Sequence, residues 1–340
     1  MKYILILLAA ALVFSGIFLL SHNDVSESEG ADFQEEERVK GVSTENTRSS
    51  TREILITEGV KHSVLLEEMI SEGQGKDSIP SIDKPNFISA EEADQFLDED
   101  SQGLGLRYKG ETRFYPYQIL VWHELVNDMI SGDALLISYA PLSGSGIVFD
   151  RSVRGEVYEF GVSGKLWQSN LLMYRRNADE ESLWSQILSE TVLGPETGTT
   201  LLIISSDTVR YGDWKKKYPG TKVLSLDTGA TRRYGADPYE DYYTNESVSF
   251  DTEFSDERLH PKEVVSGIEL SGLFKAYPKD ALPRGQTNDS FLESTIRIEK
   301  SDIGEVKIFA DEKEAEVISS FWFSWLSAHP ETELYQDNLK

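Results

Sequence analysis

A pattern repeated along the chain constrains the fold more than any single motif. Residues 105–116 and 267–278 each contain two short alternating segments around a glycine turn and end in Tyr-Pro. Because proline cannot continue a strand ladder, both predict a β-hairpin that stops at the same point. Residues 214–224 and 325–335 each place a tryptophan five residues before a proline and continue into a short strand pattern. Matching segments in one order predict two related half-repeats.

A further pair of segments, 155–160 and 304–309, begins Gly-Glu-Val in both halves and alternates with period two. It begins 39 residues after the Tyr-Pro of the hairpin in the first half and 26 residues after it in the second. From there to the tryptophan the distances are 59 and 21 residues. The first half therefore has a surplus, within 117–154 and 161–213. Function is expected in this surplus or in a cleft between the halves, unless the second half has simply lost material.

The local patterns predict a strand-rich α+β unit with few helices. Proline at the first turn and a later glycine predict a helix over 116–130. Ser89 and Glu92 form a capping box for a second helix, and Asp207 is expected to cap a third. A short helix is expected over 182–188. Alternating segments predict strands over 134–139, 146–150, 156–160 and 201–205.

The N-terminus has the pattern of a membrane-targeting segment. Lys2 precedes an unbroken run of apolar or small residues from Tyr3 to Leu20. Roughly 20 such residues are needed to cross a bilayer, and a basic residue before them leaves the rest of the chain outside the cytoplasm. No small-x-small cleavage site stands before Ser21. We expect a signal anchor over 1–21, with a cleaved signal peptide as the alternative.

An acidic linker follows this segment. Residues 22–50 carry eight acidic and three basic side chains and one aromatic residue. Such a composition cannot bury enough apolar surface to offset the entropy of the chain. We expect a disordered tether over 22–75, in which 51–75 has an apolar pattern typical of a short docked helix or a stalk. The globular part is expected to divide into a first half-repeat with insertions over 76–250 and a shorter one over 251–340.

Net charge and cysteine content exclude several classes of partner and site. The net charge of −26 argues against binding to nucleic acid or anionic lipid, both of which would repel the chain. Contact with a membrane is therefore expected through the N-terminal segment only. The chain has no cysteine, which excludes disulfides, thiolate metal ligands and thiol catalysis.

The segment Trp-His-Glu-Leu-Val-Asn-Asp at 122–128 resembles the zinc motif His-Glu-x-x-His. Asn127 stands where the second histidine should be, and zinc seldom accepts an amide ligand there. On the expected helix, His123 and Asn127 would share one face, as would Glu124 and Asp128. That arrangement suits a weak site for a harder metal or a polar helix edge bonded to nearby loops.

Other candidate motifs are incomplete. The segment Gly-Val-Ser-Gly-Lys at 161–165 lacks the glycine and hydroxyl residue that a phosphate loop needs. Ser145 and Ser163 lie between glycines without completing Gly-x-Ser-x-Gly. Asp150 and Arg151 end a strand and would place opposite charges at a sheet rim. The aromatic residues of a sugar-stacking surface, or of an ordinary core, are Trp167, Tyr174, Trp184, Tyr211 and Trp214.

Eight segments together resemble one known family, the prokaryotic domain-of-unknown-function family 3179. They lie at 115–116, 122–128, 138–142, 149–151, 160–164, 169–174, 182–186 and 237–239. The resemblance runs from about Ile79 to Tyr335, nearly the whole globular part. It implies an exported protein and carries no established activity.

Two departures from the family pattern are informative. The family usually has Cys-Pro-Leu-Cys after a Thr-Tyr strand, where this chain has Ala140 and Ser143. It also tends to have Met-Tyr-Asp-Arg where this chain has Met-Tyr-Arg-Arg at 173–176. If the family's cysteines bind metal or carry out redox work, this chain has lost that function. If they form a structural disulfide, only stability is lost, and the survival of the other motifs favours this interpretation.

Two functions fit these patterns, and no cofactor is identified. The first is a membrane-anchored envelope protein that binds a small molecule or an envelope component without catalysis. The second is an envelope hydrolase that uses His123 and nearby carboxylates, with or without a divalent cation. Buried polar groups must be hydrogen-bonded, so the polar residues of the surplus are expected to converge around a ligand or as an internal network. The residues expected at the site are His123, Glu124, Asn127, Asp128, Asp150, Arg151, Ser163, Asn170, Trp184 and Gln186.

Overall fold

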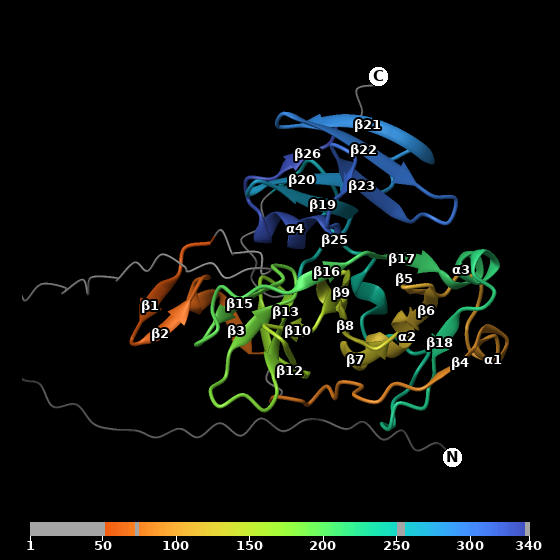
Figure 1. Cartoon of the computed structure of the whole chain (residues 1–340), viewed down its shortest axis with the longest axis horizontal. Helices are drawn as coiled ribbons and strands as arrows, with labels where there is room; N and C mark the ends of the chain where they lie inside the picture. The colour runs from red at the N-terminus through yellow and green to blue at the C-terminus, as the bar shows by residue number, and fades with distance from the viewer. Residues whose placement is uncertain (1–51, 72–74, 250–255, 337–340) are drawn as a thin grey trace, which may run out of the picture. The chain divides into compact units, whose positions relative to one another are not determined.

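The computed structural model describes residues 52–71, 75–249 and 256–336, and the expected membrane segment and most of the expected tether lie outside them. Within these ranges the chain is strand-rich, with short helices and several small sheets (Figure 1). The longest described helices have seven residues. No helix in the described part of the chain is long and apolar enough to cross a membrane.

One sheet is built around the first predicted hairpin. Its order is β17-β5-β6-β18-β4, in which β18 runs parallel to β6 and all other neighbours are antiparallel. Helix α3 (Tyr211–Lys217) connects β17 to β18. The strands are β4 Phe87–Ser89, β5 Gln102–Tyr108, β6 Glu111–Pro116, β17 Ser206–Arg210 and β18 Lys222–Leu224.

The second predicted hairpin lies in a sheet of the same design. Its order is β25-β19-β20-β26, with β26 parallel to β20 and the other neighbours antiparallel. Helix α4 (Trp322–Ala328) connects β25 to β26. The strands are β19 Val264–Leu270, β20 Leu273–Pro278, β25 Ile318–Phe321 and β26 Glu333–Leu334. Hairpin, flanking strands and connecting helix therefore have the same order and directions in both sheets.

Each hairpin is followed by an antiparallel meander. The two meanders have the orders β7-β8-β9-β16 and β21-β22-β23-β24. In the first, residues 151–201 stand between β9 and β16, whereas a two-residue turn joins β23 to β24. The strands are β7 Leu125–Ile130, β8 Asp133–Ala140, β9 Ser145–Asp150, β16 Leu202–Ile204, β21 Gly285–Phe291, β22 Ser294–Lys300, β23 Val306–Ala310 and β24 Lys313–Glu314.

These meanders correct one of the sequence pairings. The segment at 155–160 contains β11 (Glu156–Val157), which pairs with β10 (Ser152–Val153). Its expected partner at 304–309 instead contributes β23, whose place in the meander corresponds to that of β9. A short alternating pattern fits every strand of a meander, so it cannot decide which strands correspond.

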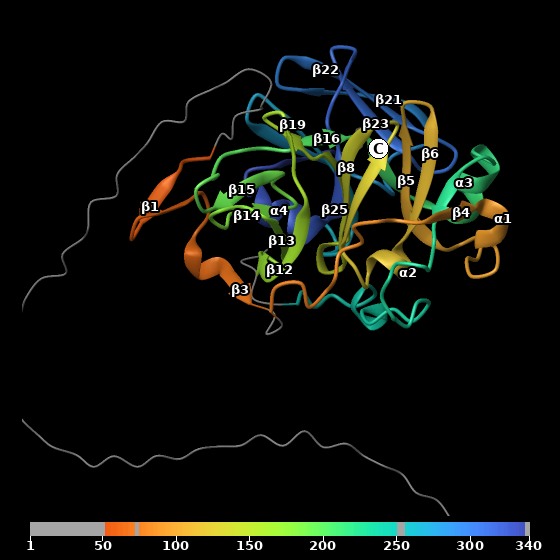
Figure 2. The same ribbon diagram turned by 60° about the horizontal axis from the view of Figure 1, so that its bottom comes forward.

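Residues 160–193, the part of the surplus that contains β12 to β15, form a sheet with β1 to β3 from the segment that precedes the first hairpin. The order is β1-β2-β15-β14-β13-β12-β3, and Figure 2 shows β12 to β15 beside one another. A docked helix or stalk over 51–75 was therefore the wrong expectation for the described residues, which form strands and one 3-10 turn (η1, Leu66–Glu68). The strands are β1 Leu55–Thr57, β2 Val60–His62, β3 Met69–Ser71, β12 Phe160–Trp167, β13 Asn170–Arg175, β14 Leu183–Ser185 and β15 Glu190–Leu193.

The tryptophan of each half packs against a glycine of its hairpin. A Cβ added at Gly105 would lie 2.6 Å from the ring of Trp214, and one added at Gly267 would lie 2.3 Å from the ring of Trp325. Both indoles are almost completely buried. Because real Cβ contacts are never this close, only glycine lets the helix seat its tryptophan on the hairpin.

The helix expected over 116–130 is mostly absent. Helix α2 covers only Tyr117–Leu120 and is followed by β7. Glu124 has a φ of 57°, in the left-handed region, which ends the helical turn. Residues 125–130 then pair with β8, so tertiary pairing overrides the local preference. His123 and Asn127 therefore lie on different elements and do not share a helix face.

The other local expectations have mixed outcomes. The strands expected over 134–139, 146–150 and 201–205 are present as β8, β9 and β16. The Ser89 capping box is present on the short helix α1 (Ala90–Ala93). The helix expected over 182–188 is wrong, because β14 occupies that segment. Asp207 lies in β17 and does not cap a helix.

Candidate functional site

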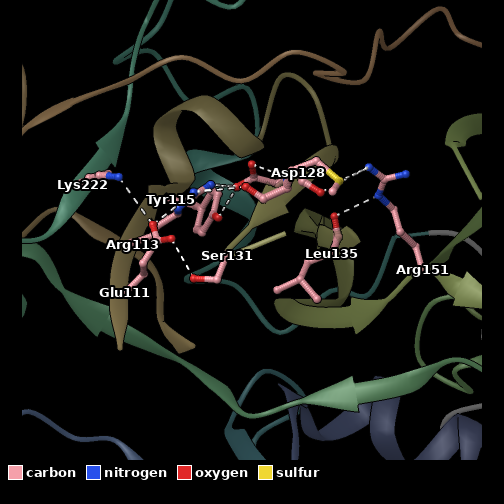
Figure 3. Close-up of polar contacts among 9 residues, drawn as sticks. Glu111, Arg113, Tyr115, Asp128, Ser131, Leu135, Arg151 and Lys222 are labelled. Carbon is pink, nitrogen blue, oxygen red and sulfur yellow. Dashed lines mark hydrogen bonds and ion pairs between the residues drawn. The ribbon is translucent and has the colours of Figure 1, made fainter. Parts of the chain in front are cut away.

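Asp128 lies at the centre of a buried polar cluster (Figure 3). Its Oδ2 accepts the hydroxyl of Tyr115 at 2.6 Å and pairs with the guanidinium of Arg113. Its Oδ1 accepts the backbone N–H of Met129 at 2.7 Å. Burial first, and the Asp128 carboxylate second, raise the pKa of Tyr115 well above its usual value, so the phenol remains a donor.

The second half contains the same arrangement. Lys275 pairs with Asp289 at 2.8 Å, and Tyr277 donates to the same carboxylate oxygen at 3.1 Å. Lys275 also donates to the carbonyl of the residue after the aspartate, as Arg113 does in the first half. Because the cluster is present in both halves, its role is to hold each hairpin against the meander that follows it. It therefore does not mark a site specific to the surplus.

Arg151 is buried, and its donors are directed at backbone carbonyls. It donates to Tyr158 O at 2.6 Å, Asp128 O at 3.2 Å and Leu135 O at 3.3 Å. It therefore ties the start of the insertion to β7 and β8 and contacts the backbone, not the carboxylate, of Asp128. Asp150 accepts the backbone N–H of Ser152 at 2.7 Å and closes the adjoining turn.

His123 and Asn127 each join distant segments. The ring nitrogens of His123 lie 2.7 Å from Pro80 O and 2.7 Å from the hydroxyl of Tyr234. Burial, and secondarily the charge of Arg232, lower the pKa of His123, which favours the neutral ring. Asn127 exchanges two hydrogen bonds with the backbone of Phe160, at 2.8 and 2.9 Å. Both side chains are thus engaged within the protein.

Asn170 and Gln186 belong to a separate network that is fully buried. Asn170 Nδ2 lies 2.9 Å from Ser143 Oγ and 2.9 Å from Gln186 Oε1. Gln186 also accepts the hydroxyl of Ser145 at 2.6 Å and donates to Ser138 at 3.1 Å. All five side chains are 0% exposed. Ser143, one of the positions where the family pattern has cysteine, is therefore part of an internal hydrogen-bond network.

The remaining predicted residues are also buried. Ser163 donates to Leu172 O across the β12–β13 hairpin. Trp184 packs edge-on against Tyr158 and Phe160, with centroids 6.0 and 5.5 Å away. Glu124 is 4% exposed in the turn before β7.

The ten predicted residues therefore fall into separate clusters, and none of them lines either of the two large clefts described below. Residue type alone does not distinguish a polar side chain that binds a ligand from one that is bonded within the protein. Polar side chains on neighbouring strands satisfy one another as readily as they bind a ligand.

A cleft of about 550 Å³ lies where the β12–β13 turn meets the segment around β1–β3 and helix α4. Figures 1 and 2 show α4 beside the sheet that contains β12–β15. We call it the Arg52 cleft. Its lining residues are Arg52, Leu55, Ser63, Val64, Leu65, Glu68, Trp167, Gln168, Asp256, Arg258, Leu326, Ser327, Ala328 and Pro330.

The charged residues of the Arg52 cleft balance one another. Arg52 donates to the backbone carbonyl of Ala328 at 2.6 Å and lies over the ring of Trp167, 5.7 Å from its centroid. The Trp167 indole donates to Glu68 at 2.7 Å. Asp256 and Arg258 form an ion pair at 2.7 Å. Two cations and two anions leave the cleft without a strong preference for a charged ligand.

Two polar atoms at the Arg52 cleft have no hydrogen-bond partner among the described residues. They are Gln168 Oε1 and Ser63 Oγ. Gln168 is 8% exposed and its amide oxygen is itself buried, so a ligand in the cleft reaches this oxygen only if the side chain turns toward it. An unpaired buried acceptor costs about 1–3 kcal/mol, and a ligand that supplied a donor would remove that cost.

Of the residues that line the Arg52 cleft, only Trp167 is distinctive in the sequence, as a possible sugar-stacking aromatic. Arg52, Glu68 and Gln168 come from segments far apart in the chain, and the first two fell in the segment expected to be tether. Within the described residues, no group of three or more His, Asp or Glu side chains is arranged to hold a metal ion.

Comparisons with known proteins gave one match. A search of curated proteins and a search of solved structures each found none. The family model described as "Protein of unknown function (DUF3179)" matches residues 76–332. Because that match covers more than half of the chain, this chain belongs to the DUF3179 family.

Proposed function

We propose that this chain is a membrane-tethered, extracytoplasmic binding protein whose ligand site is the Arg52 cleft. The tether and its orientation rest on Lys2 and the apolar run after it. The binding role rests on one observation, the unpaired Gln168 amide oxygen beside an open cleft of ligand size.

The cleft suits a short peptide segment. Its lining includes the apolar residues Leu55, Val64, Leu65 and Leu326, which would accept an apolar side chain. The amide of Gln168 offers a donor and an acceptor, which match the N–H and C=O of a peptide group. Trp167 is only 4% exposed, so it offers no open ring face on which a sugar could stack.

The common order of the two hairpin sheets and the two meanders supports an origin by duplication. Under this proposal the scaffold is the repeated unit. The sheet that only the first half contains, together with the segment before it, was added to build the binding site.

A thermal-shift experiment tests the proposal. The full-length chain in uncharged detergent is heated with alanine, the tripeptides Ala-Ala-Ala and Leu-Ala-Leu, and N-acetylglucosamine. Leu-Ala-Leu at about 100 times its Kd should stabilise the fold by roughly 2.7 kcal/mol, which raises the melting temperature by several degrees. The tripeptide Ala-Ala-Ala should give a smaller shift because it buries less apolar surface.

Two variants locate the site. Gln168→Leu should abolish the Leu-Ala-Leu shift, because it removes both partners of the peptide group. Gln102→Leu, an exposed glutamine outside the cleft, should retain it. Absence of any peptide shift, or equal loss in both variants, would contradict the proposed site.

A further inference from the structure

A second cleft, of about 540 Å³, lies between the first hairpin sheet and the second meander. We call it the interhalf cleft. Strands β5 and β17 and helix α3 contribute residues from one side, and β21, β22 and β23 contribute from the other. It shares no lining residue with the Arg52 cleft.

Four basic side chains line the interhalf cleft, although the chain as a whole has a net charge of −26. Two of them have acidic partners. Lys217 pairs with Glu305 at 2.5 Å, and Lys307 pairs with Glu314 at 2.8 Å. The positive charges of Lys217 and Lys307 are therefore neutralised by these two carboxylates.

The acidic residues of the lining are also accounted for. Glu305 belongs to the pair with Lys217, and Glu299 pairs with Arg297. The buried carboxylate of Asp207 pairs with Lys279 and accepts the backbone N–H of Val306 at 2.6 Å. Every carboxylate at the cleft is thus already matched by a donor.

The other two cations are not matched by an acid. Lys300 donates to the backbone carbonyls of Lys279 and Leu282, at 2.7 and 3.0 Å, and forms no ion pair with a described residue. Arg107 is exposed and forms no ion pair or side-chain hydrogen bond within the described ranges. Arg107 comes from β5 and Lys300 from β22, so the two charges approach the cleft from opposite sheets.

We propose that the interhalf cleft binds a small anion with two anionic groups, one held by Arg107 and the other by Lys300. The guanidinium fork of Arg107 matches the two oxygens of a carboxylate or phosphate group. The ammonium of Lys300 already has two neutral acceptors and retains one donor for an anion. The size of the cleft suits a molecule larger than a single oxyanion.

Such a ligand would also join the two sheets. Lys279 and Val306 already connect to Asp207 at the same boundary. A ligand that bridges Arg107 and Lys300 would therefore raise the stability of the boundary as well as occupy the cleft.

Calorimetric titration of the full-length chain in uncharged detergent tests this proposal. The probes are citrate, a polycarboxylate, and pyrophosphate, which contains two linked phosphate groups. Saturable binding of one probe per chain is expected for at least one of them, and the probe that binds identifies the class of anion. The affinity should fall as salt is raised, because partly exposed ion pairs are screened.

Charge variants locate the site. Arg107→Gln and Lys300→Gln should each weaken binding by about tenfold or more, the effect of losing a charge-assisted hydrogen bond. Arg233→Gln removes one exposed positive charge elsewhere and should change the affinity less than about twofold. If neither probe binds saturably, or if Arg233→Gln weakens binding as much as the cleft variants do, the proposal is overturned.

Discussion

The carboxylate of Asp207 accepts the backbone N–H of Val306 at 2.6 Å, so a buried acid on β17 is bonded to the first residue of β23. The same carboxylate pairs with Lys279, which follows β20. Burial raises the pKa of Asp207, and the charge of Lys279 opposes that shift. This one side chain therefore connects the first hairpin sheet to two elements of the second half.

Removal of the Asp207 carboxylate should weaken that connection strongly. Asp207→Ala leaves the partly buried Lys279 without its acid and the N–H of Val306 without an acceptor. Loss of one partner of a buried ion pair costs about 3–5 kcal/mol. Urea unfolding should show a decrease of that size in the free energy of unfolding. Asp302→Asn, at an exposed acid nearby in the chain, should change the free energy of unfolding by less than about 0.5 kcal/mol. Similar effects for both variants would show that Asp207 does not fasten the halves.

The glycine under each tryptophan gives a second prediction. Gly105→Ala and Gly267→Ala each place a methyl group against an indole that has no room for it. Overpacking of this kind costs about 1–3 kcal/mol, and both variants should unfold at lower urea concentration.

Gly220→Ala is the matched control for these two variants. Nothing lies within 4 Å of a Cβ added at Gly220, so the same substitution should be neutral or slightly stabilising there. If Gly105→Ala and Gly267→Ala behave like Gly220→Ala, the tryptophans are not seated on the hairpins as described.

The two hairpins could be predicted because their glycine turns and Tyr-Pro ends are local signals in the sequence. A tryptophan also recurs after each hairpin, and it packs against a hairpin glycine where no larger residue fits. The segment around His123 could not be read this way, since its helical pattern is ended by the left-handed backbone of Glu124 and its strand is fixed by pairing with β8. The pairing of 155–160 with 304–309 was wrong because a short alternating segment fits any strand of a meander.

A cleft between the halves was expected from the repeat, but the residues that line the two clefts could not be predicted from the sequence. Arg52 and Gln168 line one cleft, and Arg107 and Lys300 line the other, only because segments far apart in the chain pack together. No spacing of residues along the sequence predicts which of them line the same cleft. The polar residues that did attract notice, such as Asn170 and Gln186, have partners inside the protein.

The Asn170 and Gln186 network gives a third prediction. Gln186→Leu keeps the volume of the side chain but removes an acceptor from Asn170 and Ser145 and a donor from Ser138. Each buried group left without a partner costs about 1–3 kcal/mol, so the fold should lose several kcal/mol in urea unfolding. Gln102→Leu, at an exposed glutamine, should have little effect. A stable Gln186→Leu variant would mean that the network contributes little to the fold.

The last prediction concerns pH and His123. Burial lowers the pKa of this imidazole, and Arg232 lowers it further. As the pH falls below the usual histidine value of about 6.5, the unfolded chain therefore takes up a proton that the folded chain still excludes. The unfolded state then binds more protons, so the free energy of unfolding decreases as the pH is lowered. The contribution of His123 is fully present above pH 6.5 and is lost as the pH drops through the folded-state pKa.

Urea unfolding of the wild type and of His123→Gln between pH 7.5 and pH 5, about the range in which histidine titrates, measures this contribution. The variant should lose less stability than the wild type over that range, whatever its stability at neutral pH, because it has no imidazole to protonate. His260→Gln is the control, since His260 is exposed and the variant should keep the wild-type slope. Equal slopes for the wild type and His123→Gln would show that protonation of His123 is not coupled to unfolding, and that Pro80 and Tyr234 hold the charged ring as well as the neutral one.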